Sequence, residues 1–481
     1  MENAFYVIWA YINYLQFDQP IPNDIEVHES VIKNKKSPSR GIYEWELSLL
    51  AREIITNGER NPDQATKSFR NWNYLANTLN KLKEFENHAW PIYGDRKNIL
   101  REIRRIAHRQ FPWQSRPNSS FFLRYFKIYN NPRIKNIIEG RIGLTIQQWY
   151  TVGMAFMGAA LSFPKSTVSP NISIPTISKR EFDIVASFIS TDLNTLRLII
   201  EKEVNYDDEF VYTLNPLEYF PLVRIDNYYY CPVINFLAWR ITSGIYFDLV
   251  DDKGFGHPFG LAFQDYLKEI STKILAPDTT KVFSEEKYYV GKKAEYSIDL
   301  ILSQTDAALF VEAKTKRMRA RSKSQLLSDD AMDRDLDILA DDVVQAYATI
   351  EDYKKGKYSH FPYSDSTRVY PLIVTMEDWF LLGEDCKALS EKVKHKIQGI
   401  GIPIKCTEKT PFTICSARDF EHFLQVLNSQ GITEVMTNWF TPDKAGNNFG
   451  QFLVTYYPVG KRLTDFFPGD FEKIYSRAFP G

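Results

Sequence analysis

The stretch YSIDLILSQTDAALFVEAK, from Tyr296 to Lys314, carries the pattern on which the fold depends. It holds two short apolar runs, at 298–302 and 307–311, separated by Ser-Gln-Thr-Asp at 303–306. Short apolar runs around a cluster of turn-forming residues are typical of paired strands joined by a turn. We therefore expect two adjacent β-strands here.

Three ionisable residues, Asp299, Glu312 and Lys314, interrupt this apolar pattern. Residues two apart on a strand point to the same face, so Glu312 and Lys314 are expected to project together, and the paired strand can bring Asp299 alongside them. Charges within a strand of core composition are costly unless they are paired or bind an ion. Two carboxylates suit Mg²⁺, which prefers oxygen ligands and retains several waters. A lysine beside them can orient or help to deprotonate such a water, or neutralise charge in a transition state.

Asp299, twelve intervening residues and then Glu312-Ala313-Lys314 resemble the core motif of the PD-(D/E)xK nuclease superfamily, which has the restriction-endonuclease-like fold. The resemblance implies an α/β core with a mixed sheet flanked by helices. It also implies that Asp299 and Glu312 bind Mg²⁺, which Mn²⁺ can replace. Lys314 would then assist the water that attacks a phosphodiester bond.

A second triplet of this kind, EEK at residues 285–287, is rejected because its flanks, Ser284 and Tyr288, do not form a buried strand. The run at 307–311, in contrast, is apolar up to Glu312. The alternative for the chosen triplet is an exposed ion pair between Glu312 and Lys314 at the end of a strand.

The neighbouring residues complete an α/β pattern. We expect helices at 261–275 and 336–350, a helical region that follows the strand at 369–375 and ends at about 397, and a helix at 417–427. Strands are expected at 281–290, 369–375 and 412–415.

Further site residues are suggested by the resemblance. In one branch of the superfamily, a helix after the Glu-x-Lys strand supplies a Gln that contacts substrate or orders water, and this indicates Gln345 as a catalytic residue. Those relatives often carry Tyr four positions later, where this chain has Thr349, and a surface glutamine explains Gln345 equally well. Many members also have a Glu on the helix before the strands. Its equivalent here is Gln264, with Asp265 or Glu269 as the candidates to replace it.

A run of basic residues follows Lys314 directly: Lys316, Arg317, Arg319, Arg321 and Lys323. Cations near a phosphate release counterions and make binding dependent on salt, so this position favours a phosphate-binding segment. A disordered basic loop is the equal alternative, and the acidic stretch 329–342 can pair with the run when substrate is absent. A basic helix at 96–109 is interpreted as a solvated face with acidic neighbours rather than as a phosphate-contacting one.

Length and composition limit the number of domains and the kinds of partner that the chain can have. The chain has 481 residues, enough for two or three domains, and a net charge of -1, so any surface for nucleic acid must be local. Its four cysteines form no C-x-x-C pair and no histidine pair has zinc spacing, which argues against a zinc site. The N-terminus lacks a leader pattern, and the apolar stretch 149–163 is too short to cross a bilayer of roughly 30 Å. We expect a cytoplasmic protein without a membrane partner.

We divide the chain into four segments: a mainly helical accessory domain at 1–165, a connecting region of helices and a β-hairpin at 166–253, the nuclease domain at 254–430, and a C-terminal arm at 431–481. A linker is expected at 164–175 and a hairpin turn at Asp226-Asn227. The apolar run at 452–457 is expected to form a hairpin in the arm.

The resemblance, with Asp299, Glu312 and Lys314 intact, implies a metal-dependent nuclease that acts on nucleic acid, with DNA favoured over RNA. A DNA endonuclease of restriction or antiphage defence fits the architecture by analogy alone. The alternative is a nucleic-acid-binding or scaffold protein that lacks catalysis. The chain has no P-loop, so membership of a larger machine would need another chain for ATP-driven steps, and a protein partner or a homo-oligomer stays open.

Overall fold

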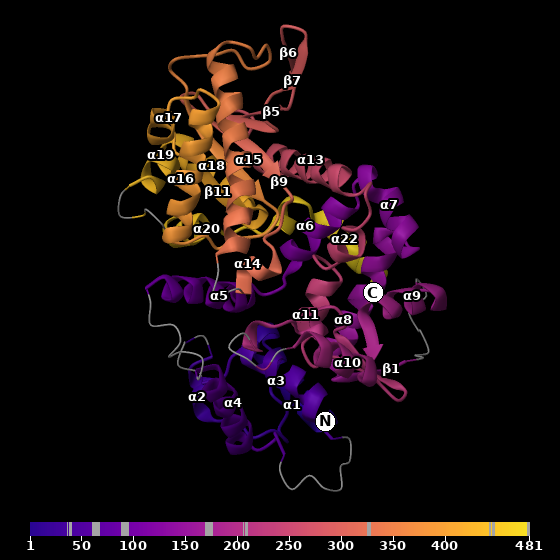
Figure 1. Cartoon of the computed structure of the whole chain (residues 1–481). Helices are drawn as coiled ribbons and strands as arrows, with labels where there is room; N and C mark the ends of the chain where they lie inside the picture. The colour runs from indigo at the N-terminus through magenta and orange to yellow at the C-terminus, as the bar shows by residue number, and fades with distance from the viewer. Residues whose placement is uncertain are drawn as a thin grey trace. The chain divides into compact units, whose positions relative to one another are not determined.

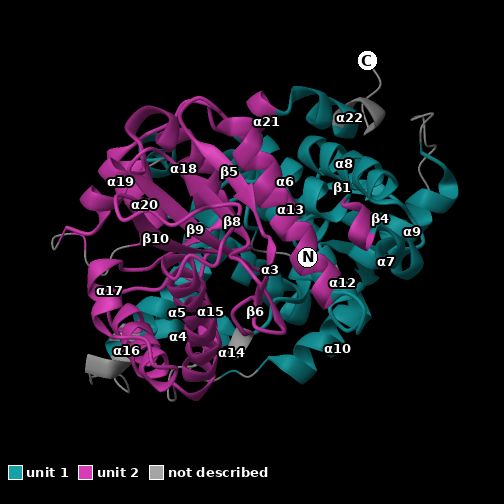
Figure 2. Cartoon of the chain, turned by 90° about the horizontal axis from the view of Figure 1, so that it is seen from above, with its two compact units in different colours: residues 1–130, 135–255, 467–481 teal, residues 131–134, 256–466 magenta. Residues whose placement is uncertain are grey.

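The computed structural model describes residues 1–35, 37, 41–59, 68–87, 96–168, 177–204, 206, 210–324, 329–441, 444 and 448–478. The chain forms two compact units (Figure 2). Unit 1 comprises residues 1–130, 135–255 and 467–481, and unit 2 comprises 131–134 and 256–466. These bounds differ from the four expected segments, because 1–165 and 166–253 fall in one unit apart from residues 131–134, and 431–481 is divided at Phe467.

Unit 1 is mainly helical. Its helices are α1 (Glu2–Phe17), α2 (Glu29–Lys33), α3 (Glu44–Asn57), α4 (Trp72–Asn87), α5 (Arg96–Gln114), α6 (Ser119–Tyr129), most of α7 (Pro132–Ile142), α8 (Ile146–Ser162), α9 (Lys179–Ile189), α10 (Leu193–Glu203), α11 (Ile234–Arg240), α12 (Ile245–Leu249) and α22 (Pro468–Ala478). A small sheet in the order β1-β4-β3-β2 joins β1 (Lys165–Thr167), β2 (Ser190–Asp192), β3 (Leu222–Ile225) and β4 (Tyr228–Tyr230).

The small sheet bears on two expectations about unit 1. The hairpin turn at Asp226-Asn227 is confirmed, since β3 and β4 pair antiparallel around it and Asp226 has a φ of 52°. The linker expected at 164–175 is wrong at its start. Lys165 to Thr167 form β1, which pairs antiparallel with β4, while residues 169–175 lie outside the described residues.

The basic helix at 96–109 is confirmed as part of α5, but its arginines do not all form a solvated face. Arg105 is 1% exposed; its guanidinium pairs with Glu102 at 2.9 Å and lies 3.8 Å from the centroid of the Tyr212 ring. Arg109 pairs with Glu86 at 2.5 Å. Burial of a charge requires such partners, and an arginine engaged in this way is not available to phosphate.

Unit 2 is built on a five-stranded mixed sheet in the order β11-β10-β9-β8-β5. Its strands are β5 (Lys281–Ser284), β8 (Leu300–Ser303), β9 (Ala307–Lys314), β10 (Arg368–Thr375) and β11 (Thr413–Ser416). β10 runs parallel to β9 and β11, whereas β8 is antiparallel to β9 and β5. A separate hairpin consists of β6 (Lys287–Val290) and β7 (Lys293–Tyr296).

Helices cover both faces of this sheet. They are α13 (Gly256–Ile274), α14 (Ala320–Ser324), α15 (Asp330–Lys354), α16 (Glu384–Gly399), α17 (Lys405–Lys409), α18 (Ala417–Gln430), α19 (Ile432–Trp439), α20 (Phe449–Tyr456) and α21 (Leu463–Phe466). Figure 2 shows the sheet with α15 and α16 on one side and α13 and α18 on the other. The expected α/β class with a mixed sheet flanked by helices is confirmed.

The strands around the central stretch form for local reasons. Ser303 to Asp306 provide the expected turn, closed by a hydrogen bond from Gln304 N to Ala307 O of 2.8 Å. On one face of β9, Ala308 and Phe310 are fully buried against α15. The alternation of side chains then directs Glu312 and Lys314 to the same face.

Two other expectations for unit 2 were wrong. The strand expected at 281–290 is interrupted at Glu285 and Glu286, where the chain passes from β5 into the hairpin. The apolar run at 452–457 lies mostly in α20 rather than in a hairpin. Asn448 caps this helix by accepting a hydrogen bond from Gln451 N, and Phe449, Phe452 and Leu453 are buried at helical spacing.

Within the described part of the chain, no helix combines the length and the apolar character needed to cross a membrane.

Candidate active site

Asp299, immediately before β8, lies opposite Glu312 of β9. In the antiparallel register Leu300 pairs with Val311, so the next pair outward is Asp299 and Glu312. Directly opposed residues of such a ladder share a face. Asp299 immediately precedes β8, and its Oδ2 accepts a hydrogen bond of 2.7 Å from Ala313 N, which holds the carboxylate against β9.

Lys314 links Glu312 to helix α15. Its Nζ lies 2.8 Å from Glu312 Oε1 and 3.3 Å from Asp342 Oδ1, and it donates a hydrogen bond of 3.1 Å to Gln345 Oε1. Asp342 and Gln345 are three residues apart, which places them on one face of the helix. The structure therefore places Asp299, Glu312, Lys314 and Gln345 close to one another.

Burial dominates the electrostatics of the two carboxylates. Glu312 is 2% exposed. Loss of hydration raises the pKa of Asp299 and of Glu312 above their ordinary values, and the charge of Asp299 raises the pKa of Glu312 further. Burial alone would lower the pKa of Lys314, but the charges of Glu312 and Asp342 outweigh it and raise that pKa. Lys314 is therefore an ammonium at neutral pH.

One carboxylate oxygen of this centre has no partner. Glu312 Oε2 is buried and makes no hydrogen bond, although Oε1 is paired with Lys314. Leaving a buried acceptor unsatisfied costs about 1–3 kcal/mol or more for a charged group. An oxygen held in this way beside Asp299 is suited to ligate a hard cation.

The donor set fits a magnesium ion that keeps much of its water. Asp299 and Glu312 would supply the protein ligands. Among the described residues, no group of three or more His, Cys, Asp and Glu side chains is arranged to hold a metal ion. The centre is therefore a site with two carboxylates, not a cage made by protein alone.

The residues of α13 that were candidates for a further acidic position are placed differently. Asp265 Oδ2 accepts a hydrogen bond of 2.8 Å from Arg133 Nε, so Asp265 belongs to an ion pair. Gln264 is half-buried and Glu269 is exposed. The geometry thus assigns no role in the centre to Asp265.

Glu285, from the triplet that the sequence argument rejected, lies beside the centre instead. Its main-chain N donates a hydrogen bond of 3.0 Å to Asp299 O. The antiparallel register that pairs Ser284 with Leu300 places Glu285 opposite Asp299 in the next pair. Burial is the main cause of the raised pKa of Asp299, and the charge of Glu285 adds to it. Asp342 was also missed, although its spacing from Gln345 could have indicated it.

The basic run after Lys314 is partly engaged in ion pairs. Arg317 pairs with Glu377 at 3.1 Å, and Arg319 Nε lies 3.3 Å from Asp335 Oδ1. Asp335 belongs to the acidic stretch that was expected to pair with this run. Lys316 and Lys323 are half-buried, and Arg321 lies in the short helix α14, but its side chain is outside the described residues.

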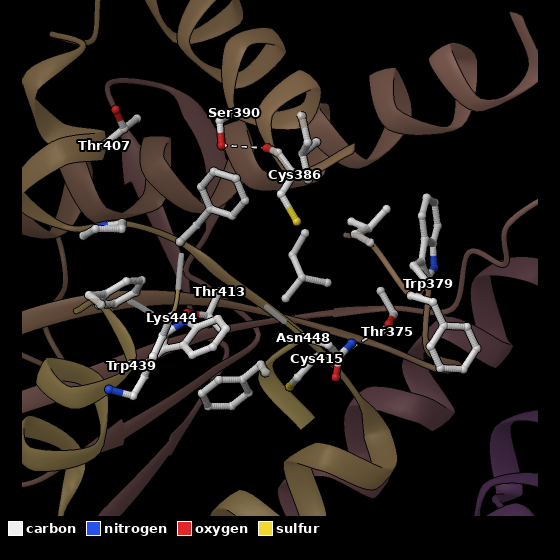
Figure 3. Close-up of a pocket in the computed structure, with 18 of the residues that line it drawn as sticks. Thr375, Trp379, Cys386, Ser390, Thr407, Thr413, Cys415, Trp439, Lys444 and Asn448 are labelled. Atoms are coloured by element: carbon white, nitrogen blue, oxygen red, sulfur yellow. Dashed lines mark hydrogen bonds between the residues drawn. The ribbon is translucent and has the colours of Figure 1, made fainter. Parts of the chain in front are cut away.

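A cavity of about 440 Å³ lies elsewhere in unit 2, around the C-terminal ends of β10 and β11 (Figure 3). Aromatic rings such as Trp379 and Trp439 line it together with residues of α16. Trp379 Nε1 is buried without a hydrogen-bond partner. Burial, helped by the charge of Asp419, raises the pKa of Asp378 at the wall of the cavity. No sequence pattern indicated this space.

The stability of the metal-free protein is expected to decrease as the pH rises. The folded protein holds protons on Asp299 and Glu312 that the unfolded chain has already released. This stabilisation is fully present below the ordinary carboxyl pKa and is lost as the pH rises through the raised values of the folded protein. Urea denaturation in EDTA at about pH 5 and about pH 9 measures the change.

The control is Glu312→Gln, which keeps the shape of the side chain but cannot ionise. It should be more stable than the wild type at the higher pH and nearly equal to it at the lower pH. A difference in the free energy of unfolding that does not depend on pH would contradict the assignment of the raised pKa.

Comparison with protein-family models, curated proteins and solved structures finds no match for this chain. The function of the centre is therefore inferred from its own geometry.

Proposed function

We propose that the chain is a metal-dependent nuclease with Asp299, Glu312 and Lys314 at its centre. The observation that carries the proposal is a pair of neighbouring carboxylates, the half-buried Asp299 just before β8 and the buried Glu312 on β9, with Glu312 Oε2 unpartnered and a lysine on Oε1. If no ligand binds Glu312 Oε2, the free-energy cost of removing this oxygen from water is not offset by any interaction. The spacing of the PD-(D/E)xK motif and the mixed sheet flanked by helices support a restriction-endonuclease-like core.

Mg²⁺ held by Asp299 and Glu312 would lower the pKa of a bound water and neutralise charge on the phosphate. Lys314 remains protonated beside its three acceptors, so it acts as a hydrogen-bond donor rather than as a general base. It orients the attacking water or stabilises the negative charge that develops on the phosphate. Asp342 and Gln345 fix the position of the ammonium.

DNA is the favoured substrate, and the segment at 316–323 is the proposed phosphate-binding element. Arg319 is exposed at this segment, whereas its ion-pair partner Asp335 is fully buried. If Arg319 moved to a phosphate, Asp335 would keep only its hydrogen bonds from Arg319 N and Ser322 Oγ, so the exchange carries a cost that contacts with the phosphate must offset. An endonuclease of restriction or antiphage defence remains the biological role that we propose by analogy with architecture.

A second candidate function is a nucleic-acid-binding or scaffold protein without catalysis. It is favoured by the lack of a third metal ligand among the described residues. It is also favoured by the three side chains that already pair or hydrogen-bond with the ammonium of Lys314. The unpartnered Glu312 Oε2 favours the nuclease instead, because a scaffold has no use for it.

The proposal is tested by incubating the protein with plasmid, linear duplex, single-stranded DNA and RNA in Mg²⁺, Mn²⁺ or EDTA. We expect cleavage of at least one DNA in either metal and none in EDTA. Binding of nucleic acid without cleavage in any metal would support the scaffold function.

A further inference from the structure

The hairpin β6–β7 is a direct extension of the strands that hold the centre. Glu285 and Glu286 connect β5 to β6, and Ser297 to Asp299 connect β7 to β8. A hydrogen bond of 2.8 Å from Ser297 N to Glu286 O continues the ladder between them. In Figure 1 the hairpin extends beyond β5 at one end of unit 2.

One face of the hairpin is anchored on unit 2. Tyr288 donates a hydrogen bond of 2.6 Å to Asp352 near the end of α15, and its ring centroid lies 5.3 Å from that of Tyr358. The ring also packs against the hydrophobic core between the sheet and α15. This anchor fixes which face of the hairpin is turned to solvent.

The opposite face presents two tyrosines and a lysine. The register pairs Lys287 with Tyr296 and Tyr289 with Ala294, so these side chains share the face that Tyr288 does not occupy. Tyr289 is 65% exposed and Tyr296 is 55% exposed. Lys287 Nζ lies 5.4 Å from the centroid of the Tyr289 ring. Single exposed aromatics are ordinary, but two neighbours on one face beside a cation form a surface on which bases can stack.

The charge of the hairpin is complementary to a nucleic acid. Residues 287–296 contain three lysines and one glutamate. Lys293 is paired with Glu295 at 2.5 Å. Of the other two lysines, Lys287 lies on the face that carries Tyr289 and Tyr296, and Lys292 lies next to that face. These two cations are placed to contact phosphates while the tyrosines contact bases.

We propose that the face formed by Lys287, Tyr289 and Tyr296 binds single-stranded nucleic acid and leads it to the centre. Unpaired bases offer the free ring faces that stacking requires, whereas those of a duplex are covered by their neighbours. Tyr296 is three residues from Asp299, about 10 Å along an extended chain. That length matches roughly three base steps. The inference rests on the proposed nuclease function and specifies its substrate as a single strand or an unpaired segment.

The test is the binding of a fluorescently labelled single-stranded oligonucleotide of mixed sequence, followed by anisotropy in EDTA so that no cleavage occurs. Tyr289→Ala and Tyr296→Ala are each expected to weaken binding about tenfold or more. Tyr289→Phe keeps the ring and should bind like the wild type. Val290→Ala, on the anchored face of the same hairpin, is the matched control and should also bind normally.

Unchanged affinity in both alanine variants would overturn the inference and leave the nuclease proposal standing, because cleavage is measured separately. Equal affinity of the wild type for single strand and duplex, lost equally in the variants, would overturn the assignment to unpaired bases. Failure of the wild type to bind any single strand would overturn it as well. Circular dichroism of the variants, whose changed side chains are exposed, confirms that they are folded.

Discussion

Glu312→Gln is expected to reduce the rate of cleavage by about a thousandfold or more. The amide keeps the shape of the carboxylate but removes the charge that holds the metal, and activation by a bound metal is worth several kcal/mol of transition-state stabilisation. Asp299→Asn should have a comparable effect, while its amide oxygen can still accept the hydrogen bond from Ala313 N. Single-turnover cleavage rates in Mg²⁺ measure both variants.

The same substitution separates a metal defect from a folding defect. Mg²⁺ should raise the melting temperature of the wild type, because a ligand that binds only the folded protein stabilises it. It should not raise the melting temperature of Glu312→Gln, although this variant should be at least as stable as the wild type without metal. Cleavage by Glu312→Gln at the normal rate, or a melting temperature of the wild type that does not rise with Mg²⁺, would contradict the proposed metal site.

Lys314→Met is expected to lower both activity and stability. Loss of a positioned donor to the reacting phosphate or water reduces the rate by about 10²–10³-fold. Removal of one partner from a buried ion pair costs about 3–5 kcal/mol when the pH is above the raised pKa of Glu312, because its carboxylate is then left as an uncompensated buried charge. The methionine retains the apolar length of the side chain, so the loss reports the charge. Single-turnover rates and urea denaturation measure the two effects.

A double variant tests the reason for the lost stability. Adding Glu312→Gln to Lys314→Met removes the unpaired charge and should recover most of the free energy of unfolding without any activity. Lys316→Met, two residues further along the chain and half-buried, is the matched control and should retain a normal free energy of unfolding. A double variant as unstable as Lys314→Met alone would show that the charge of Glu312 is not the cause.

The parts of the fold that follow from local pattern could be predicted from the sequence. The turn at Ser303 to Asp306 needs only its composition and its apolar flanks. The shared face of Glu312 and Lys314 follows from the two-residue period of a strand. Gln345 could be placed on a helix from the apolar stripe beside it, and the hydrogen bond with Lys314 agrees with its predicted position.

The parts that depend on distant pairing could not be predicted. Glu285 reaches the centre only because the register between β5 and β8 sets it opposite Asp299, and its own flanks do not show a buried strand. Arg105 looks solvated in its helix, but residues more than a hundred positions away bury it against Tyr212. The apolar run in α20 is compatible with both helix and strand, and the cap at Asn448 and its packing decide the outcome.

A comparison of cleavage by the wild type and by Asp299→Ala, side by side in Mg²⁺ and in EDTA, tests whether the two carboxylates and their metal perform the reaction. The proposed centre predicts cleavage by the wild type in Mg²⁺ alone and no cleavage by the variant under either condition. Cleavage that persists in Asp299→Ala, or that survives in EDTA, would show that the two carboxylates and their metal are not the source of the activity.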